Sequence, residues 1–230
     1  KESCSEAIGS FERAIKLFQE SQRTLRAQLN RIDKIDEKDL VVKLIEASNT
    51  RGEYCHGRIE IEEARILDKQ GDHVASSGKY EAAAVTFQEI SQADSEQTRK
   101  EVKPLIYLCQ AWQKMTLAEA RSSPILYKEA AELFKLANEH TPSESASLLA
   151  LAHSSFCKAL EIGTQFEITR NATMYTETKR YMDAAADYYL KAGFETASEY
   201  AKATKRLFDA YVYMNNAKRE VDPEKEAKYY

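Results

Sequence analysis

Apolar residues recur at steps of three and four along most of the chain, a pattern that predicts helices with one buried face each. A helix over about residues 5–32 is predicted by one such stripe: Ile8, Phe11, Ile15, Phe18, Leu25, Leu29 and Ile32. The charged residues 33–39 predict a turn. The helical pattern resumes at Leu40 and continues to Ser77, with a break expected at residues 49–52 because Gly52 follows a short polar run.

Prolines and glycines mark the later helix ends. Ser123, Thr141 and Asp222 each stand directly before a proline, so each can cap a helix that has proline at its first position. They predict helices over about residues 124–139 and 142–167 and one that opens at 223, with a capping box formed by residues 141–144. A helix over about 103–121 comes before them, with Pro104 near its start or at a bend. Gly193 ends a helix, and residues 197–217 form the next one, with Ala201, Thr204, Phe208 and Tyr211 facing inward.

Residues 67–93 carry the most specific pattern, in which small and aromatic residues alternate at fixed offsets. The residues that carry this pattern are Leu67, Gly71, Gly78, Tyr80, Ala83 and Phe87. Gly71 lets a neighbouring helix approach closely, and Gly78 can adopt a positive φ and end the first helix at little steric cost. Tyr80 and Phe87 are then expected to fill the wedge between two helices.

This spacing resembles a tetratricopeptide repeat, with Leu67 where that family usually has Trp. Its second half returns at Tyr127, Ala130, Phe134 and Ala137, after an interval longer than the family's period. Uneven, long helices make the chain similar to the soluble NSF attachment proteins. The resemblance implies an all-α, right-handed superhelix of nine or ten antiparallel helices. We expect one such domain over residues 1–230, cut from a longer protein.

Composition supports a helical chain and excludes several functions. Charged residues make up 30% of the sequence, with only 7 glycines and 4 prolines, which favours helices throughout. The net charge of −4 is small and its acids and bases alternate, so neither nucleic acid nor a membrane surface is an expected partner. No apolar run is long enough for a membrane span. The four scattered cysteines form no CxxC and indicate a reducing, cytoplasmic setting.

Motifs for chemistry are sparse. Glu53 and His56 form a single ExxH, whereas a di-iron bundle needs two. His73, His140 and His153 have no His or Cys at ligand spacing, and phosphate-binding and nucleophile motifs are missing from the sequence. We therefore expect no metal, no cofactor and no enzymatic activity, although any helical surface rich in Glu and Lys contains acid–base pairs.

Tyrosine is the one residue type whose distribution along the chain suggests a binding surface. Nine of the thirteen tyrosines follow residue 170, and tyrosine is favoured at interfaces because it adds area with few rotors. The predicted partner-binding residues are Tyr175, Arg180, Tyr189, Tyr200 and Tyr213. The chain is then a scaffold that binds a peptide or partner helix on its concave face. Two alternatives stay open: a self-associating, homodimeric regulatory domain of a signalling protein, and a helical-bundle enzyme or ligand carrier.

Overall fold

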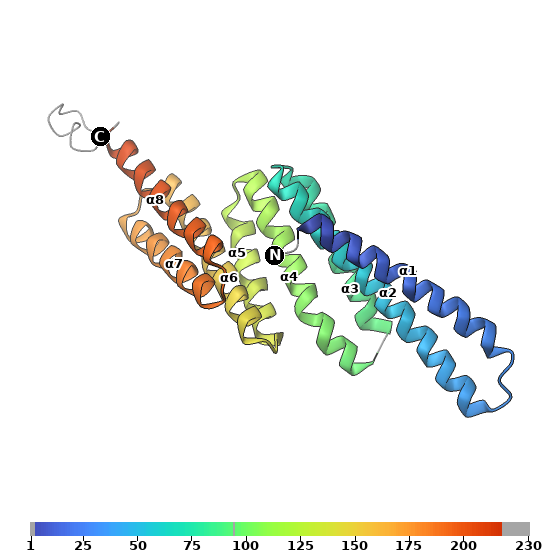
Figure 1. Ribbon diagram of the computed structural model, residues 1–230. Coiled ribbons are helices and arrows are strands. Elements are labelled where there is room, and N and C mark those ends of the chain that lie inside the picture. Colours follow the sequence, from blue (N-terminus) through green and yellow to red (C-terminus); the bar gives the residue numbers. More distant parts are fainter. Residues whose placement is uncertain (1–2, 94, 218–230) are drawn as a thin grey trace. The chain divides into compact units, whose positions relative to one another are not determined.

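The computed structural model describes residues 3–93 and 95–217, and this part of the chain forms eight α-helices and no strand (Figure 1). The helices are α1 (Cys4–Leu29), α2 (Ile35–Lys69), α3 (His73–Ala93), α4 (Glu96–Arg121), α5 (Pro124–His140), α6 (Glu144–Thr169), α7 (Ala172–Lys191) and α8 (Glu195–Ala217). The expected all-α class is confirmed for these residues. None of their helices combines the length and the apolar character that crossing a bilayer requires.

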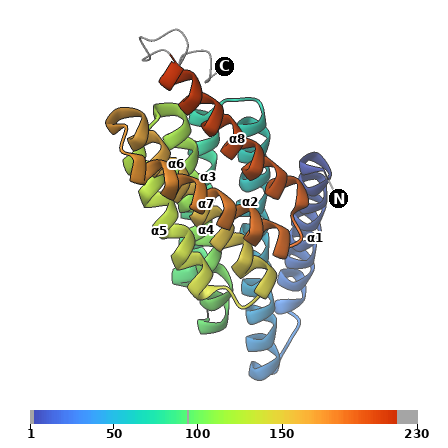
Figure 2. The same cartoon turned by 90° about the vertical axis from the view of Figure 1, so that its left-hand side faces the viewer.

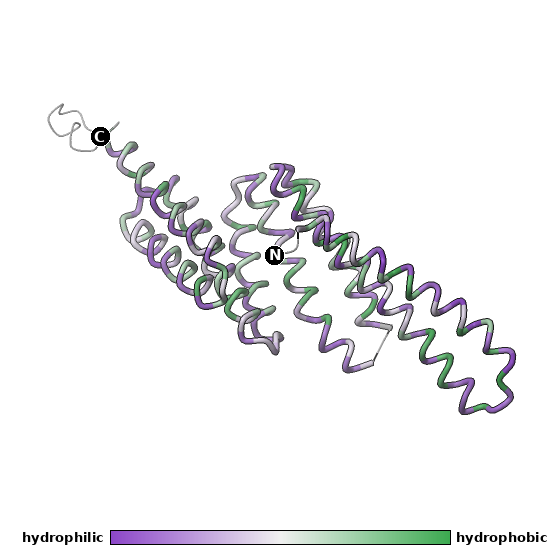
Figure 3. The backbone as a smooth tube through the Cα atoms, in the orientation of Figure 1, coloured by the Kyte–Doolittle hydropathy of each residue, from purple (hydrophilic) through white to green (hydrophobic). Residues whose placement is uncertain are grey.

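The helices fall into two compact units, the first unit with α1–α4 (Lys1–Arg121) and the second with α5–α8 (Ser122–Tyr230). Within each unit, every helix packs against the next one along the chain, as α1 and α2 show in two views (Figure 1 and Figure 2). Hydrophobic and hydrophilic positions alternate along these helices, so each can bury one face against its neighbour (Figure 3). The continuous right-handed superhelix stays a prediction.

Aromatic side chains and alanines form the core of the first unit. Phe87 of α3 is fully buried, and its ring lies edge-on to the ring of Tyr54 in α2, with centroids 5.6 Å apart. Gly57 of α2 makes room for this ring, because a Cβ there would stand 2.9 Å from Phe87 Cζ. Tyr80 of α3 packs on Trp112 of α4. Tyr80 and Phe87 are thus both buried, Tyr80 toward α4 and Phe87 toward α2, and their assignment to a repeat stays a prediction.

The core of the second unit joins α5 through α8. Phe134 of α5 is fully buried and stacks on the imidazole of His153 in α6, with ring centroids 4.9 Å apart. The buried Ser154 hydroxyl donates a hydrogen bond to the Ala131 carbonyl oxygen, which joins α6 to α5. All four residues of the second repeat-like motif, Tyr127, Ala130, Phe134 and Ala137, are buried, as the spacing predicts.

The turn after α2 lies at Gly71, and the expected helix end at Gly78 is wrong. Gly71 has φ +82°, and the Asp72 N–H donates to the Leu67 carbonyl, which is the Schellman arrangement that ends a helix. Gly78 instead lies on the exposed side of α3, inside the helix. Leu67 is half-buried in the last turns of α2. Gly71 thus ends the helix, and no neighbouring helix packs closely on Gly78, where a Cβ would meet nothing within 4 Å.

Two other boundaries also differ from the expectation. α2 continues through residues 49–52, because packing against both α1 and α3 outweighs the cost of about 1 kcal/mol that one glycine adds. Ser143 caps α6 in place of Thr141, whose backbone is extended, as a residue before proline prefers. Pro104 is buried inside α4. The helix expected to open at 223 lies outside the described residues. The residues that the structure describes form eight helices, where nine or ten are expected for the whole chain.

Two predicted boundaries are confirmed. Ser123 caps α5 with Pro124 at the first helical position. Gly193 has φ +85° and follows the last turn of α7, where the Phe194 N–H donates to the Tyr189 carbonyl. This is the same Schellman geometry that ends α2, so similar turns join α2 to α3 and α7 to α8.

Candidate functional site

The predicted partner-binding tyrosines differ in their exposure, and Tyr189 is a correction. Its side chain is only 4% exposed, and its hydroxyl lies 2.9 Å from Nδ1 of His153 in α6. Burial raises the pKa of this hydroxyl far above its ordinary value. Tyr188, rather than Tyr189, is the more exposed member of the pair, although it also packs against the core of the second unit. Tyr189 is therefore a core residue and is unsuited to partner binding.

Tyr175 belongs to a cluster between α7 and α8. Its hydroxyl donates a 2.6 Å hydrogen bond to Oδ1 of Asp209, and Lys179 lies over its ring. The ring also packs against Phe166 and Phe208. Burial and the bond to Asp209 raise the pKa of the Tyr175 hydroxyl. These contacts hold α8 against α7 and leave Tyr175 only half-buried.

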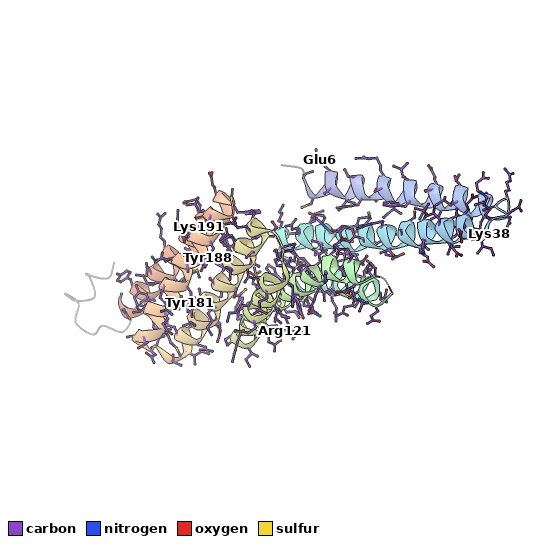
Figure 4. The ribbon with its side chains drawn as sticks, turned by 90° about the horizontal axis from the view of Figure 1, so that it is seen from below. Glu6, Lys38, Arg121, Tyr181, Tyr188 and Lys191 are labelled. Carbon is purple, nitrogen blue, oxygen red and sulfur yellow. The ribbon has the colours of Figure 1, made fainter. Side chains whose placement is uncertain are left out.

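Arg180 is exposed on α7, and its guanidinium lies over the ring of Tyr181, 5.0 Å from the centroid. Tyr181 and Tyr188 follow each other along α7 (Figure 4). Both rings pack in part against the core of the second unit. Of this group, Arg180 offers a planar cation at the surface.

Three side chains are the most exposed of the large hydrophobic residues on α8. Tyr200 is 62% exposed, Leu207 60% and Tyr211 56%. At 100° per residue they fall within about 40° of one another around the helix, so they form one stripe, which we call the α8 stripe. The expectation that Tyr211 faces inward is therefore wrong. Tyr200 also touches the ring of Phe156 in α6, with centroids 5.7 Å apart.

Tyr213 is 51% exposed on a different side of α8 from the stripe. The helix packs against α7 through other residues, with Ala201 and Val212 buried. Lys205 donates to both carboxylate oxygens of Asp183 in α7, at 2.6 Å each. The α8 stripe therefore lies on another side of the helix from Ala201, Val212 and Lys205, and the contact of Tyr200 with Phe156 joins it to the core. The spacing of seven and then four residues between Tyr200, Leu207 and Tyr211 could have predicted this stripe from the sequence. It was missed because Tyr211 was expected to pack inward.

A second candidate site lies in the first unit, where the structure gathers three residues that the sequence keeps apart. Nδ1 of His73, at the start of α3, lies 2.9 Å from Oδ1 of Asp68 in α2 and 3.4 Å from Oε2 of Glu119 in α4. Each side chain is between a quarter and two fifths exposed, so water reaches the cluster. Burial and the nearby Asp68 carboxylate raise the pKa of Glu119, and His73 opposes this shift.

Charged and aromatic groups continue from this cluster along α2. The buried Glu62 carboxylate accepts two hydrogen bonds from one guanidinium nitrogen of Arg65, at 3.0 and 3.3 Å. The Arg65 guanidinium also lies over the ring of Trp112, 5.8 Å from its centroid. Arg65 is thus already paired with Glu62, while the polar contacts of Asp68 and Glu119 run to Nδ1 of His73.

The single ExxH motif of the sequence, formed by Glu53 and His56, is exposed on α2, as expected for a solvated helix face. A surface depression of about 500 Å³ between α3 and α4 is lined by several basic side chains, among them Arg99, Lys100 and Lys103. Lys100 is paired with Glu96 at 2.8 Å. No histidine or cysteine lines this depression.

No family model matches the chain, and no curated protein or solved structure matches it either.

Proposed function

We propose that this chain is a tetratricopeptide-like protein-interaction scaffold and that it binds a peptide or partner helix through the second unit. The observation that carries the proposal is the α8 stripe, in which Tyr200, Leu207 and Tyr211 stand exposed on one side of a helix. Another side of the same helix is already packed against α7. The proposal concerns binding, not catalysis, and it needs no cofactor.

Physical reasons favour this stripe as a binding surface. Interface energy concentrates in tyrosine, tryptophan and arginine anchors, while isolated exposed charges contribute little. Tyr200 and Tyr211 combine a large ring with a polar tip, so they can exchange water for a partner at small entropic cost. Arg180 of α7 and Tyr213, on another side of α8, are also exposed in the second unit, but the proposal rests on the stripe alone. A partner helix with apolar residues at matching spacing fits such a ridge.

Two observations support the wider setting of the proposal. The four cysteines are free, with three of them buried, which suits a reducing compartment such as the cytoplasm. Consecutive helices pack against each other within each unit, as in helical-repeat scaffolds. The runner-up function is self-association through the same stripe, with a second copy as the partner.

Site-specific photo-crosslinking tests the proposal. A benzophenone amino acid is placed at position 200 or 211 and, as a control, at the exposed position Glu12 of α1. After irradiation in extract of the source cell, we expect a discrete crosslinked protein from positions 200 and 211 and none from position 12. A product of twice the chain mass favours the runner-up. Crosslinks from position 12 alone contradict the proposed surface.

A further inference from the structure

We propose that Asp68, His73 and Glu119 bind a first-row divalent cation of the Zn²⁺ type, at the end of the α2–α3 hairpin where α4 also ends. The sequence predicts no metal site, because these residues are spread over three helices and show no ligand spacing. The proposal does not depend on the α8 stripe, which lies in the other unit.

The separations within the cluster suit a shared metal ion. The three possible ligand atoms all lie within 4.8 Å of one another, and two of the separations are 2.9 and 3.4 Å. Zinc binds imidazole nitrogen and carboxylate oxygen at about 2.0–2.2 Å, which places tetrahedral ligands about 3.4 Å apart. A cation therefore fits between these atoms after small side-chain shifts, on the order of 1 Å.

The charge balance also favours a cation. Two carboxylates, Asp68 and Glu119, face the one imidazole of His73. A neutral imidazole carries no charge to balance them. A divalent cation held by all three groups would balance both negative charges.

The backbone holds two of the ligands close together. The Schellman turn at Gly71 reverses the chain between Asp68 and His73, and Asp72 caps α3 by accepting from the Ala75 N–H at 3.0 Å. The partial exposure of the three side chains leaves positions for water, as in zinc sites with three protein ligands. An imidazole ligand favours zinc, cobalt or nickel over magnesium and calcium.

Titration calorimetry of the whole chain with Zn²⁺, in a phosphine reductant, tests the proposal. We expect one saturable site that Glu119→Gln and His73→Gln each weaken by at least about tenfold. Asp72→Asn is the matched control. It removes one negative charge from the same turn, keeps a capping side chain, and is expected to change the affinity by less than about threefold.

Two further measurements distinguish the proposed site from capture of the ion by a thiol. Cys4 lies close to the end of α2, with its Sγ 3.9 Å from Nζ of Lys69, so Cys4→Ser tests whether this thiol binds Zn²⁺. Zn²⁺ should raise the melting temperature of the wild type and of Cys4→Ser, but not that of Glu119→Gln. Circular dichroism checks that each variant is folded. The proposal is overturned if Zn²⁺ shows no saturable binding, if the Glu119 and His73 variants bind like the wild type, or if Cys4→Ser abolishes the site.

Discussion

Replacing Gly57 by alanine probes the close contact between α2 and α3. A Cβ at this position would stand 2.9, 3.1 and 3.2 Å from three atoms of the Phe87 ring, closer than packed carbon atoms come. Phe87 is fully buried, so its ring cannot swing away into solvent. Overpacking of this kind costs about 1–3 kcal/mol. Alanine also gains about 1 kcal/mol of helix propensity over glycine, which partly offsets the clash.

Gly52→Ala supplies the matched control, because Gly52 lies in the same helix and a Cβ there meets nothing within 4 Å. The propensity gain cancels between the two variants. Gly57→Ala should therefore be less stable than Gly52→Ala by about 1–3 kcal/mol, which is the packing cost alone. Leucine lacks the ring atoms that approach Gly57, so in a Phe87→Leu background this difference should nearly vanish.

Urea unfolding followed by the fluorescence of Trp112 is the suitable assay. Trp112 is the single tryptophan and packs on Tyr80 in the first unit, so its signal reports the unit that is perturbed. The reasoning is refuted if Gly57→Ala is as stable as Gly52→Ala, or if the difference between them persists without the Phe87 ring.

Three more predictions follow from the packing and the turns. Phe134→Ala removes a buried ring stacked on His153 and should cost about 3–5 kcal/mol by thermal unfolding; a loss below about 1 kcal/mol would show a surface residue. Gly71→Ala forces alanine to φ +82° and should cost about 1–2 kcal/mol, whereas Gly78→Ala, inside α3, should stabilise by about 0.5–1 kcal/mol; the opposite order would place the turn at Gly78. The raised pKa of Glu119 means that, just above pH 4.5, the folded chain holds a proton that the unfolded chain has released. The free energy of unfolding should therefore fall as pH rises from 4.5 toward the raised pKa. In chelator, Glu119→Gln should flatten this part of the curve of stability against pH, and an unchanged curve would exclude the shift.

The sequence predicts the helical class and most of the buried aromatic positions, because both depend on local periodicity. Phe87 and Phe134 stand at positions where an apolar stripe and a small neighbour coincide, and both are fully buried. The turn at Gly71 could not be predicted in the same way. Gly71 and Gly78 are both candidates for a helix end, and only the hydrogen bonds from Gly71 and Asp72 back to α2 distinguish them.

The candidate sites depend on tertiary contacts, which a single sequence shows poorly. Tyr189 and Tyr211 each lie on a helix with tyrosines on several sides, and only packing decides that Tyr189 is buried and Tyr211 exposed. Glu119 approaches Asp68 and His73 because α4 packs against α3 and returns to the turn after α2. No spacing rule within one helix can find such a set.

The affinity of the crosslinked partner for variants of the α8 stripe tests the proposed function most directly. Tyr200→Ala and Tyr211→Ala should each weaken binding by about 1–3 kcal/mol, with unchanged circular dichroism, because both side chains are largely exposed. A double charge reversal at Glu12 and Arg23, both exposed on α1, should change the affinity by less than about 0.5 kcal/mol at physiological salt. Normal binding by both tyrosine variants, together with a loss in the charge-reversed variant, would contradict a binding surface on α8.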